Sequence, residues 1–338
     1  MKTDILKRIF FVAGLIVFCI SCRNKNANGA QEAILKRPPF AELTDSIEKF
    51  PGNAGLFQRR ADLLARNNLH EIASADFQQS WILNPTEESG WKYASNLRIL
   101  NSMPELIHLL QECIKKFPSN NIFSRELGDI YAQGGQAEQA LALYDDILKK
   151  DSTDFDTWYE KGMLLNERGD TAGAIEAVRR AWTLQPVRTY ALQLANMYAE
   201  EKNPAALKIC DEWLAKDTLH ELTDPMLIKG IYYSNTGQYA AAMIQFDSCI
   251  RRDWKTTDAY IEKGIVLFRQ KKFNDALPVF KMASTVSNTN PDAWFWMGRC
   301  YDTLGKKEEA LLNYERARAL NRNLTEADEA IKRLSGKN

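Results

Sequence analysis

The sequence predicts an all-α protein made of about eight copies of one helical hairpin. A small residue recurs every 33 to 35 positions between residues 61 and 298. Larger residues, mostly apolar, stand four positions before and three positions after these small residues, which is the spacing of neighbours on one face of a helix. The recurring small residues are Ala61, Ser95, Gly128, Gly162, Ala195, Gly230, Gly264 and Gly298.

A second helix is predicted in most copies by an alanine with a larger apolar residue four positions later. Glycines lie between the two helices, where a chain that reverses direction can adopt a left-handed turn. Prolines follow several second helices and end them, because proline cannot continue the helical hydrogen bonds. The alanines are Ala73, Ala140, Ala174, Ala242, Ala276 and Ala310, and the glycines are Gly135, Gly169, Gly237 and Gly305.

The N-terminal residues 1–21 have the pattern of a cleaved signal peptide. Lys2, Lys7 and Arg8 precede twelve uncharged residues, and the small residue Ser21 follows them. Twelve residues rise only about 18 Å as a helix, which is short of the roughly 30 Å core of a bilayer. A permanent membrane span is therefore the weaker interpretation.

The string Cys19-Ile20-Ser21-Cys22 resembles a bacterial lipobox, although Cys19 stands where that pattern usually has leucine. The resemblance implies that Cys22 becomes the lipidated first residue of the mature protein. More than one acyl chain would give stable anchoring. The alternatives are an ordinary cleaved signal peptide or an uncleaved anchor. Residues 22–36 begin with a polar stretch and are predicted to be a flexible, lipidated tether.

Three further segments follow the tether. Residues 37–53 are predicted to contain one helix that packs on the first hairpin. Residues 54–322 hold the eight hairpins. Residues 323–338 are predicted to form a polar capping helix, from Thr325 to Leu334, and a short tail.

The repeated residues resemble the tetratricopeptide repeat, in which Trp, Leu-Gly, Tyr, Ala, Phe, Ala and Pro recur over 34 positions. The resemblance implies a right-handed α-solenoid whose concave side binds peptides or proteins. One hairpin buries too little apolar surface to fold alone, so each is stabilised by its neighbours. The second and fifth copies match the pattern least well.

Composition and motifs argue against several other functions. The chain has 44 Lys and Arg residues and 44 Asp and Glu residues, so nucleic acid is not an expected partner. Cys113, Cys210, Cys249 and Cys300 fall on or beside core positions and are expected to be small buried side chains. The three histidines have no zinc-binding spacing, and we find no nucleophile or phosphate-binding motif. We expect no enzyme activity, no cofactor and no metal.

In the tetratricopeptide family the concave side is lined by the first helix of each hairpin, at the positions three before and one after the small residue. By resemblance, these are the partner-binding positions. They hold Gln58 and Asp62, Lys92 and Asn96, Arg125 and Asp129, Tyr159 and Met163, Leu192 and Asn196, Leu227 and Ile231, Ile261 and Ile265, and Phe295 and Arg299.

Two binding hypotheses follow. Lys92 and Asn96 match the start of the clamp with which some family members hold a C-terminal carboxylate. The acidic residues Glu126, Asp156 and Glu160 stand where the clamp would continue, and three acids would repel a carboxylate.

The second hypothesis is an apolar groove across the last three hairpins, which a peptide or another hydrophobic ligand would enter. The competing interpretation is that superhelical curvature, or a returning segment such as residues 31–50, covers these side chains. The predicted groove residues are Leu227, Ile231, Ile261, Ile265, Phe268 and Phe295.

The sequence therefore predicts a non-enzymatic scaffold or adaptor that a lipid holds in a bacterial envelope, on the outer membrane and facing the periplasm. Its partners would be other envelope proteins or peptides, and the resemblance implies the assembly of secretion, pilus or cell-wall machinery. The alternative is a carrier or sensor that takes a hydrophobic peptide or lipid into the C-terminal groove.

Overall fold

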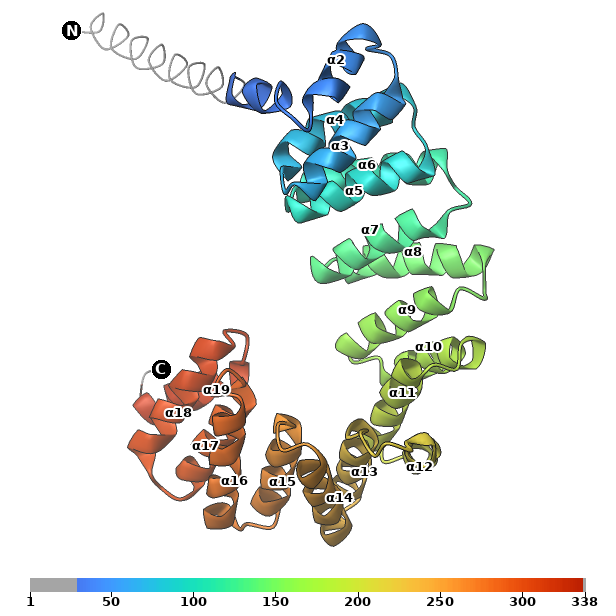
Figure 1. The fold of residues 1–338 in the computed structure, drawn as a ribbon. Helices are drawn as coiled ribbons and strands as arrows, with labels where there is room; N and C mark the ends of the chain where they lie inside the picture. The colour runs from blue at the N-terminus through green and yellow to red at the C-terminus, as the bar shows by residue number, and fades with distance from the viewer. Residues whose placement is uncertain (1–28, 337–338) are drawn as a thin grey trace, which may run out of the picture. The chain divides into compact units, whose positions relative to one another are not determined.

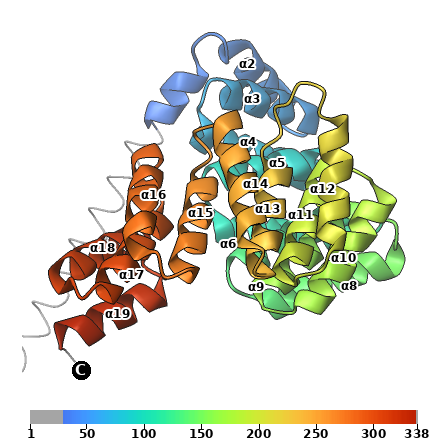
Figure 2. The same ribbon diagram turned by 90° about the horizontal axis from the view of Figure 1, so that it is seen from below.

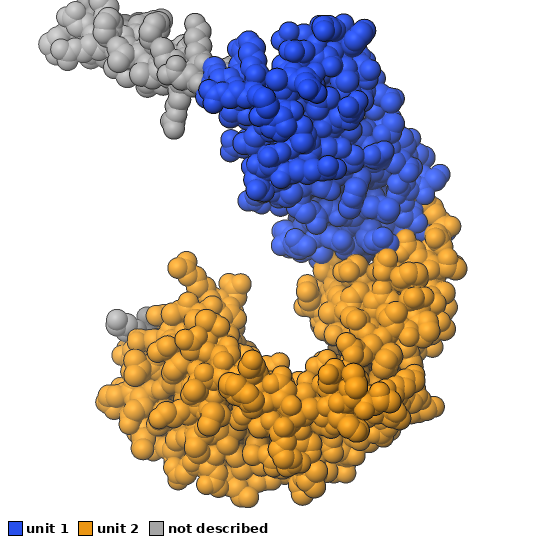
Figure 3. All heavy atoms as spheres, viewed as in Figure 1, with its two compact units in different colours: residues 1–149 blue, residues 150–338 orange. Residues whose placement is uncertain are grey.

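The computed structural model describes residues 29–336, and within this range the regular structure is entirely helical. The chain divides into two compact units, Met1–Lys149 and Lys150–Asn338 (Figure 3). Each unit is described by itself below. The all-α fold of stacked hairpins predicted from the sequence is confirmed.

Eight antiparallel hairpins run along the described chain (Figure 1). The first unit contains α3 (Ala54–Arg66) with α4 (His70–Leu83), α5 (Glu87–Ile99) with α6 (Met103–Lys116), and α7 (Asn121–Gln133) with α8 (Ala137–Lys150). The second unit contains α9 (Phe155–Glu167) with α10 (Thr171–Leu184), α11 (Arg188–Glu200) with α12 (Ala205–Lys216), α13 (Asp224–Asn235) with α14 (Tyr239–Arg252), α15 (Thr257–Arg269) with α16 (Phe273–Val286), and α17 (Pro291–Thr303) with α18 (Lys307–Leu320).

The recurring glycines let the two helices of a hairpin approach closely. A Cβ atom built on Gly128 would lie 2.6 Å from Cε1 of Tyr144, and one built on Gly298 would lie 2.8 Å from Cδ1 of Tyr314. Both pairs are separated by sixteen positions, one residue on the first helix and the other on the second. The side chain of the second helix therefore occupies the space that a larger residue on the first helix would need.

A residue with left-handed backbone ends the first helix of every hairpin. Gly135 has φ 73° and Gly169 has φ 81°, each seven positions after the small residue of its hairpin. In four hairpins a residue other than glycine stands at this position. It takes the left-handed backbone conformation, which L-residues rarely adopt. These residues are Asn68, Asn101, Lys202 and Lys271.

The register of the second hairpin differs by one residue from the predicted one. Asn101 has φ 54°, and seven positions before it stands Ala94 rather than Ser95. Ala94 is 2% exposed and belongs to the core of the first unit, whereas the Ser95 hydroxyl donates to the Trp91 carbonyl on its own helix. Ala94 is therefore the packing residue of this hairpin, and the positions three before and one after it hold Trp91 and Ser95.

The described part of the predicted tether is mostly helical. Residues 29–35 are helical, so the prediction of a flexible segment is wrong over these residues of 22–36. Ile34 and Leu35 pack against the core of the first unit, and the Thr44 hydroxyl donates to the Leu35 carbonyl at 2.8 Å. The apolar side chains hold this segment on the folded part. The predicted signal peptide 1–21 and the proposed lipid site Cys22 lie outside the described residues.

Helix α2 (Ala41–Lys49) lies within the predicted packing segment 37–53, and a hydrogen bond from a buried arginine joins it to the first hairpin. Arg60 on α3 donates to both carboxylate oxygens of Asp76 on α4, at 2.6 and 2.7 Å. A third guanidinium nitrogen donates to the Thr44 hydroxyl at 3.0 Å. The arginine therefore ties three helices together through hydrogen bonds that satisfy its buried charge.

Helix α19 (Thr325–Ser335) follows the last hairpin, in the segment predicted to cap the array, and lies beside α18 in both ribbon views (Figures 1 and 2). Its buried residues Ala327, Ala330 and Ile331 form one core with Ala310 and Tyr314 of α18. Its other faces carry acidic and basic residues. The apolar face of the last hairpin is thus covered by a helix whose outer side is polar.

The four cysteines of the described chain are buried and form no disulfide. Burial raises the pKa of the Cys113, Cys210 and Cys300 thiols to about 12, so these thiols stay protonated and unreactive. The prediction that they are core side chains is confirmed. No helix of residues 29–336 is both long and apolar enough for a membrane span.

Candidate partner-binding surface

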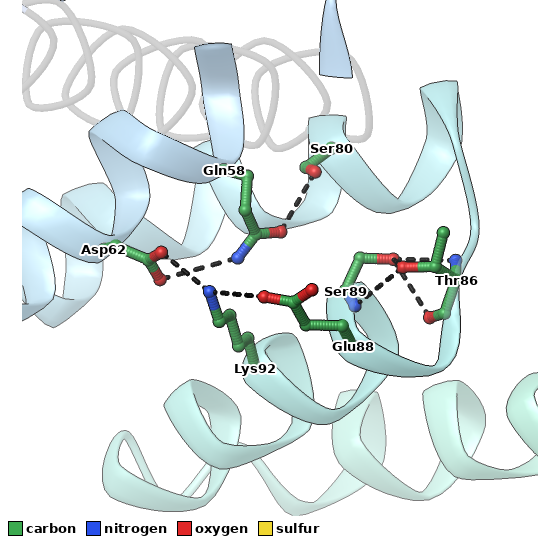
Figure 4. Close-up of polar contacts among 7 residues, drawn as sticks. All are labelled: Gln58, Asp62, Ser80, Thr86, Glu88, Ser89 and Lys92. Carbon is green, nitrogen blue, oxygen red and sulfur yellow. Dashed lines mark hydrogen bonds and ion pairs between the residues drawn. The ribbon is translucent and has the colours of Figure 1, made fainter. Parts of the chain in front are cut away.

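The predicted cation Lys92 is already paired within the first unit (Figure 4). Its ammonium group lies 2.8 Å from Asp62 Oδ2 and 2.9 Å from Glu88 Oε1. Gln58 takes part in the same group of contacts, because it accepts a hydrogen bond from Ser80 at 3.1 Å and lies 3.5 Å from Asp62. A carboxylate from a partner would compete with two carboxylates of this chain for Lys92.

The predicted binding residue Asn96 is buried. It is 3% exposed, and its amide group donates to the His70 carbonyl and contacts His70 Nδ1, each at 3.0 Å. This follows from the one-residue register shift, which turns Asn96 away from the partner-facing position. The burial of Asn96 and the pairing of Lys92 both count against the carboxylate clamp, which the acidic residues of the next hairpins already disfavoured.

The six predicted groove residues do not form one continuous exposed stripe. Ile261 and Ile265 on α15 are 5% and 8% exposed and belong to a core with α16 and α17. Leu227 and Ile231 on α13 are half-buried against Phe246 and Val266. The first helices α13, α15 and α17 contact one another, so apolar residues at these positions are covered by the next hairpin. The competing interpretation, covered core, holds for Ile261 and Ile265.

The last two predicted residues, Phe268 and Phe295, line one cavity of about 500 Å³ at the C-terminal end of the second unit. Helices α15, α17, α18 and α19 form its walls. A volume of this size falls within the roughly 300–1,000 Å³ of sites that hold small ligands. The other residues around it are Arg299, Asp302, Thr303, Tyr314, Glu326, Glu329, Ala330 and Arg333.

Arg299 stands one residue after Gly298, at a position predicted to bind partners, and three aromatic rings lie around it. Its guanidinium carbon lies 4.4 Å from the centre of the Trp296 ring, 5.0 Å from that of Phe268 and 5.9 Å from that of Phe295. Trp296 also lies edge-on to Phe268, at 5.3 Å between centres. The rings fix the arginine by cation–π contacts that leave its N–H groups available for hydrogen bonds.

Some charged side chains around the cavity form ion pairs with each other, and others do not. Asp302 forms an ion pair with Arg333 and accepts a hydrogen bond from the Tyr314 hydroxyl at 3.4 Å. Within residues 29–336, Arg299 makes no ion pair with a carboxylate. Glu326 and Glu329 on α19 are exposed and have no cationic partner in this part of the chain either. The cavity therefore has one unpaired cation among its aromatic residues and two unpaired anions on α19.

A carboxylate with a raised pKa lies on the same helix as Phe268. Burial, with a smaller contribution from the charge of Glu200, raises the pKa of Glu262 to about 7. Asp258 and Asp292 act in the same direction, whereas Arg269 opposes them. No group of three or more metal-ligating side chains was found in residues 29–336, so these acids supply no metal site there.

Known proteins resemble this chain in both sequence and fold. Residues 107–155 and residues 291–324 each match a family model described as tetratricopeptide repeat. The second stretch covers the hairpin that carries Phe295 and Arg299. The fold is that of a tetratricopeptide array.

Two curated relatives are distant. The BBSome complex member bbs-4 of Caenorhabditis elegans is 21% identical over 58% of this chain, and pre-mRNA-splicing factor 6 of Saccharomyces cerevisiae is 23% identical over 80%. The matched regions are only 33% and 31% of the lengths of those proteins. Both relatives are larger proteins, so their activities do not transfer to this chain.

A crystal structure of a tetratricopeptide repeat protein from Parabacteroides merdae has a similar fold. The two structures superpose with a TM-score of 0.66 at 18% identity, over 73% of this chain and 98% of the other. At this identity the likeness concerns the fold.

Proposed function

We propose that this protein is an adaptor that binds a segment of another protein at the C-terminal end of its hairpin array. The observation that carries the proposal is the cavity of about 500 Å³ that Phe268 of α15 lines together with Phe295 and Arg299, the two predicted partner-binding positions of α17. Rings and an arginine that are already fixed in place lose little entropy on binding, which favours affinity.

The anchor belongs to the same proposal. The lipobox-like string at residues 19–22 supports lipidation of Cys22 in a bacterial envelope, on the outer membrane and facing the periplasm. The described chain starts at residue 29, which is seven residues after Cys22. A fully extended chain covers at most about 3.6 Å per residue, so the first unit would stay within about 25 Å of the lipid.

Replacing Cys22 with alanine tests the anchor. The Cys22→Ala protein should be released from membranes or accumulate with its signal peptide attached. A variant with unchanged mature size and unchanged membrane retention would refute lipidation, and would leave the adaptor proposal standing.

The alternative function, a carrier of a hydrophobic ligand, has less support. A carrier of this kind would need a continuous apolar groove, whereas Ile261 and Ile265 are buried against neighbouring helices. The cavity that Phe268 and Phe295 line has charged groups around it, which an acyl chain would leave without partners.

Affinity capture from detergent-solubilised membranes of the source cells separates the two functions. The adaptor should retain a defined set of proteins that a Phe295→Ala/Arg299→Ala variant does not retain. Organic extraction of the same eluates tests the carrier. Recovery of lipid in place of proteins, or the same proteins with both chains, would contradict the adaptor proposal.

A further inference from the structure

We infer that the C-terminal cavity recognises a peptide segment that carries both charges, with an acidic group that pairs with Arg299 and a basic group that pairs with Glu326 or Glu329. The inference rests on the adaptor function proposed above and specifies the chemistry of the partner. It depends on three features of the described residues.

The first feature is the unpaired guanidinium. An arginine is charged at every physiological pH, and burying part of it among rings without an anion is unfavourable. Trp296, Phe268 and Phe295 contact its face, so the hydrogen-bonding edge is the part left for a ligand. A carboxylate matches this edge, because it can accept two parallel N–H hydrogen bonds from one guanidinium.

The second feature is that Asp302 already has partners within the second unit. Its ion pair with Arg333 and the hydrogen bond from Tyr314 satisfy the carboxylate without Arg299. Arg333 is likewise occupied. Arg299 is therefore the cation of the cavity that forms no ion pair within residues 29–336.

The third feature is the pair of glutamates on α19. Glu326 and Glu329 are three positions apart on a helix, so they lie on the same face, and both line the cavity. They would repel a ligand that is purely acidic. A ligand with a basic group beside its acidic group removes this repulsion and pairs all three charges.

An array of synthetic ten-residue peptides, probed with the full chain in detergent, tests the inference. The peptides combine one Asp or Glu with one Lys or Arg at varied spacing around an aromatic or aliphatic residue. Matched peptides replace the acid with Asn or Gln, or the base with Gln. We expect binding to fall at least tenfold when either charge is removed.

Two variants assign each charge to its partner. Arg299→Gln should abolish the preference for the acidic peptide and keep the preference for the basic group. Glu326→Gln/Glu329→Gln should do the reverse, and because both glutamates are exposed this variant should fold normally. Arg299→Lys keeps the charge and should retain part of the acidic preference.

The inference is wrong if neutral peptides bind as well as charged ones, if no peptide binds, or if Arg299→Gln leaves the acidic preference unchanged. Each of these results can occur while membrane extracts still yield a protein partner that depends on Phe295 and Arg299. In that case the adaptor function stands and only the charge pattern of its partner is refuted.

Discussion

Gly128 and Tyr144 illustrate how each hairpin is held together. The tyrosine ring lies where a Cβ atom of residue 128 would stand, 2.6 Å from that position, and its hydroxyl donates to Asp129 Oδ1 at 2.6 Å. The ring is thus fixed at both ends. It cannot move aside for a larger residue without losing a hydrogen bond to a carboxylate whose pKa burial has raised.

Gly128→Ala should destabilise the first unit. Overpacking a core costs about 1–3 kcal/mol, and the higher helix propensity of alanine returns roughly 1 kcal/mol of this. We expect a net loss of up to about 2 kcal/mol, seen as a lower midpoint of urea unfolding followed by circular dichroism. Gly52→Ala is the control, because nothing lies within 4 Å of its Cβ position. Equal midpoints for the two variants would contradict this packing.

Lys271→Gly should stabilise the second unit. Lys271 has φ 62°, a left-handed conformation that costs an L-residue about 1 kcal/mol and glycine nothing. The expected gain is a few tenths to about 1 kcal/mol, because glycine also gives the unfolded chain more freedom. Lys272→Gly makes the same change at φ −89°, where no strain is relieved, and should not stabilise. Thermal unfolding of both variants checks the difference.

Asp76→Ala should be severely destabilising. It leaves the Arg60 guanidinium buried with only the Thr44 hydroxyl as partner, and loss of one member of a buried pair costs about 3–5 kcal/mol. Asp211→Ala is the matched control, because its ion pair with Lys229 involves a carboxylate that is 60% exposed and should contribute at most about 1 kcal/mol. Similar effects of the two substitutions on urea unfolding would refute the structural role of Arg60.

Stability of the second unit should fall as pH rises from about 4.5 to about 7. The pKa of Glu262 is raised to about 7 in the folded state, so the folded chain holds a proton there that the unfolded chain has released. Above pH 7 the charge is present and its penalty, about 3 kcal/mol for a pKa raised from 4.5 to about 7, is complete.

Glu262→Gln removes this dependence. The variant should unfold at a higher temperature than the unchanged chain at pH 8, and at nearly the same temperature at pH 4.5. The neighbouring acids Glu200, Asp258 and Asp292 stay in both proteins, so the difference between the two pH profiles reports Glu262. A difference that does not change with pH would show that Glu262 keeps an ordinary pKa.

The sequence predicted the fold because its signals are local and repeated. The glycine at position 128 and those at 162, 230, 264 and 298 each pack on the side chain sixteen positions later. The second hairpin was misaligned because Ser95 is also small and fits a spacing of 34. Asn101 held the missing signal, since asparagine is the residue other than glycine that most readily adopts the left-handed turn.

The binding surface could be predicted only in part. The sequence placed Phe295 and Arg299 at partner-facing positions, but the rings around the arginine come from two hairpins, and their distances depend on how α15 packs on α17. The burial of Ile261 and Ile265 has the same cause. Exposure at these positions depends on the neighbouring hairpin, which the pattern within one repeat does not specify.

The most direct test of partner binding places a photoreactive phenylalanine analogue at Phe295 or at Leu312. Phe295 lines the cavity, whereas Leu312 lies on the second helix α18 and is 67% exposed. After irradiation of cells that carry the full chain, residue 295 should crosslink one or a few defined proteins that residue 312 does not reach. If both positions capture the same proteins, or position 295 captures none, this surface is not where the protein meets its partner.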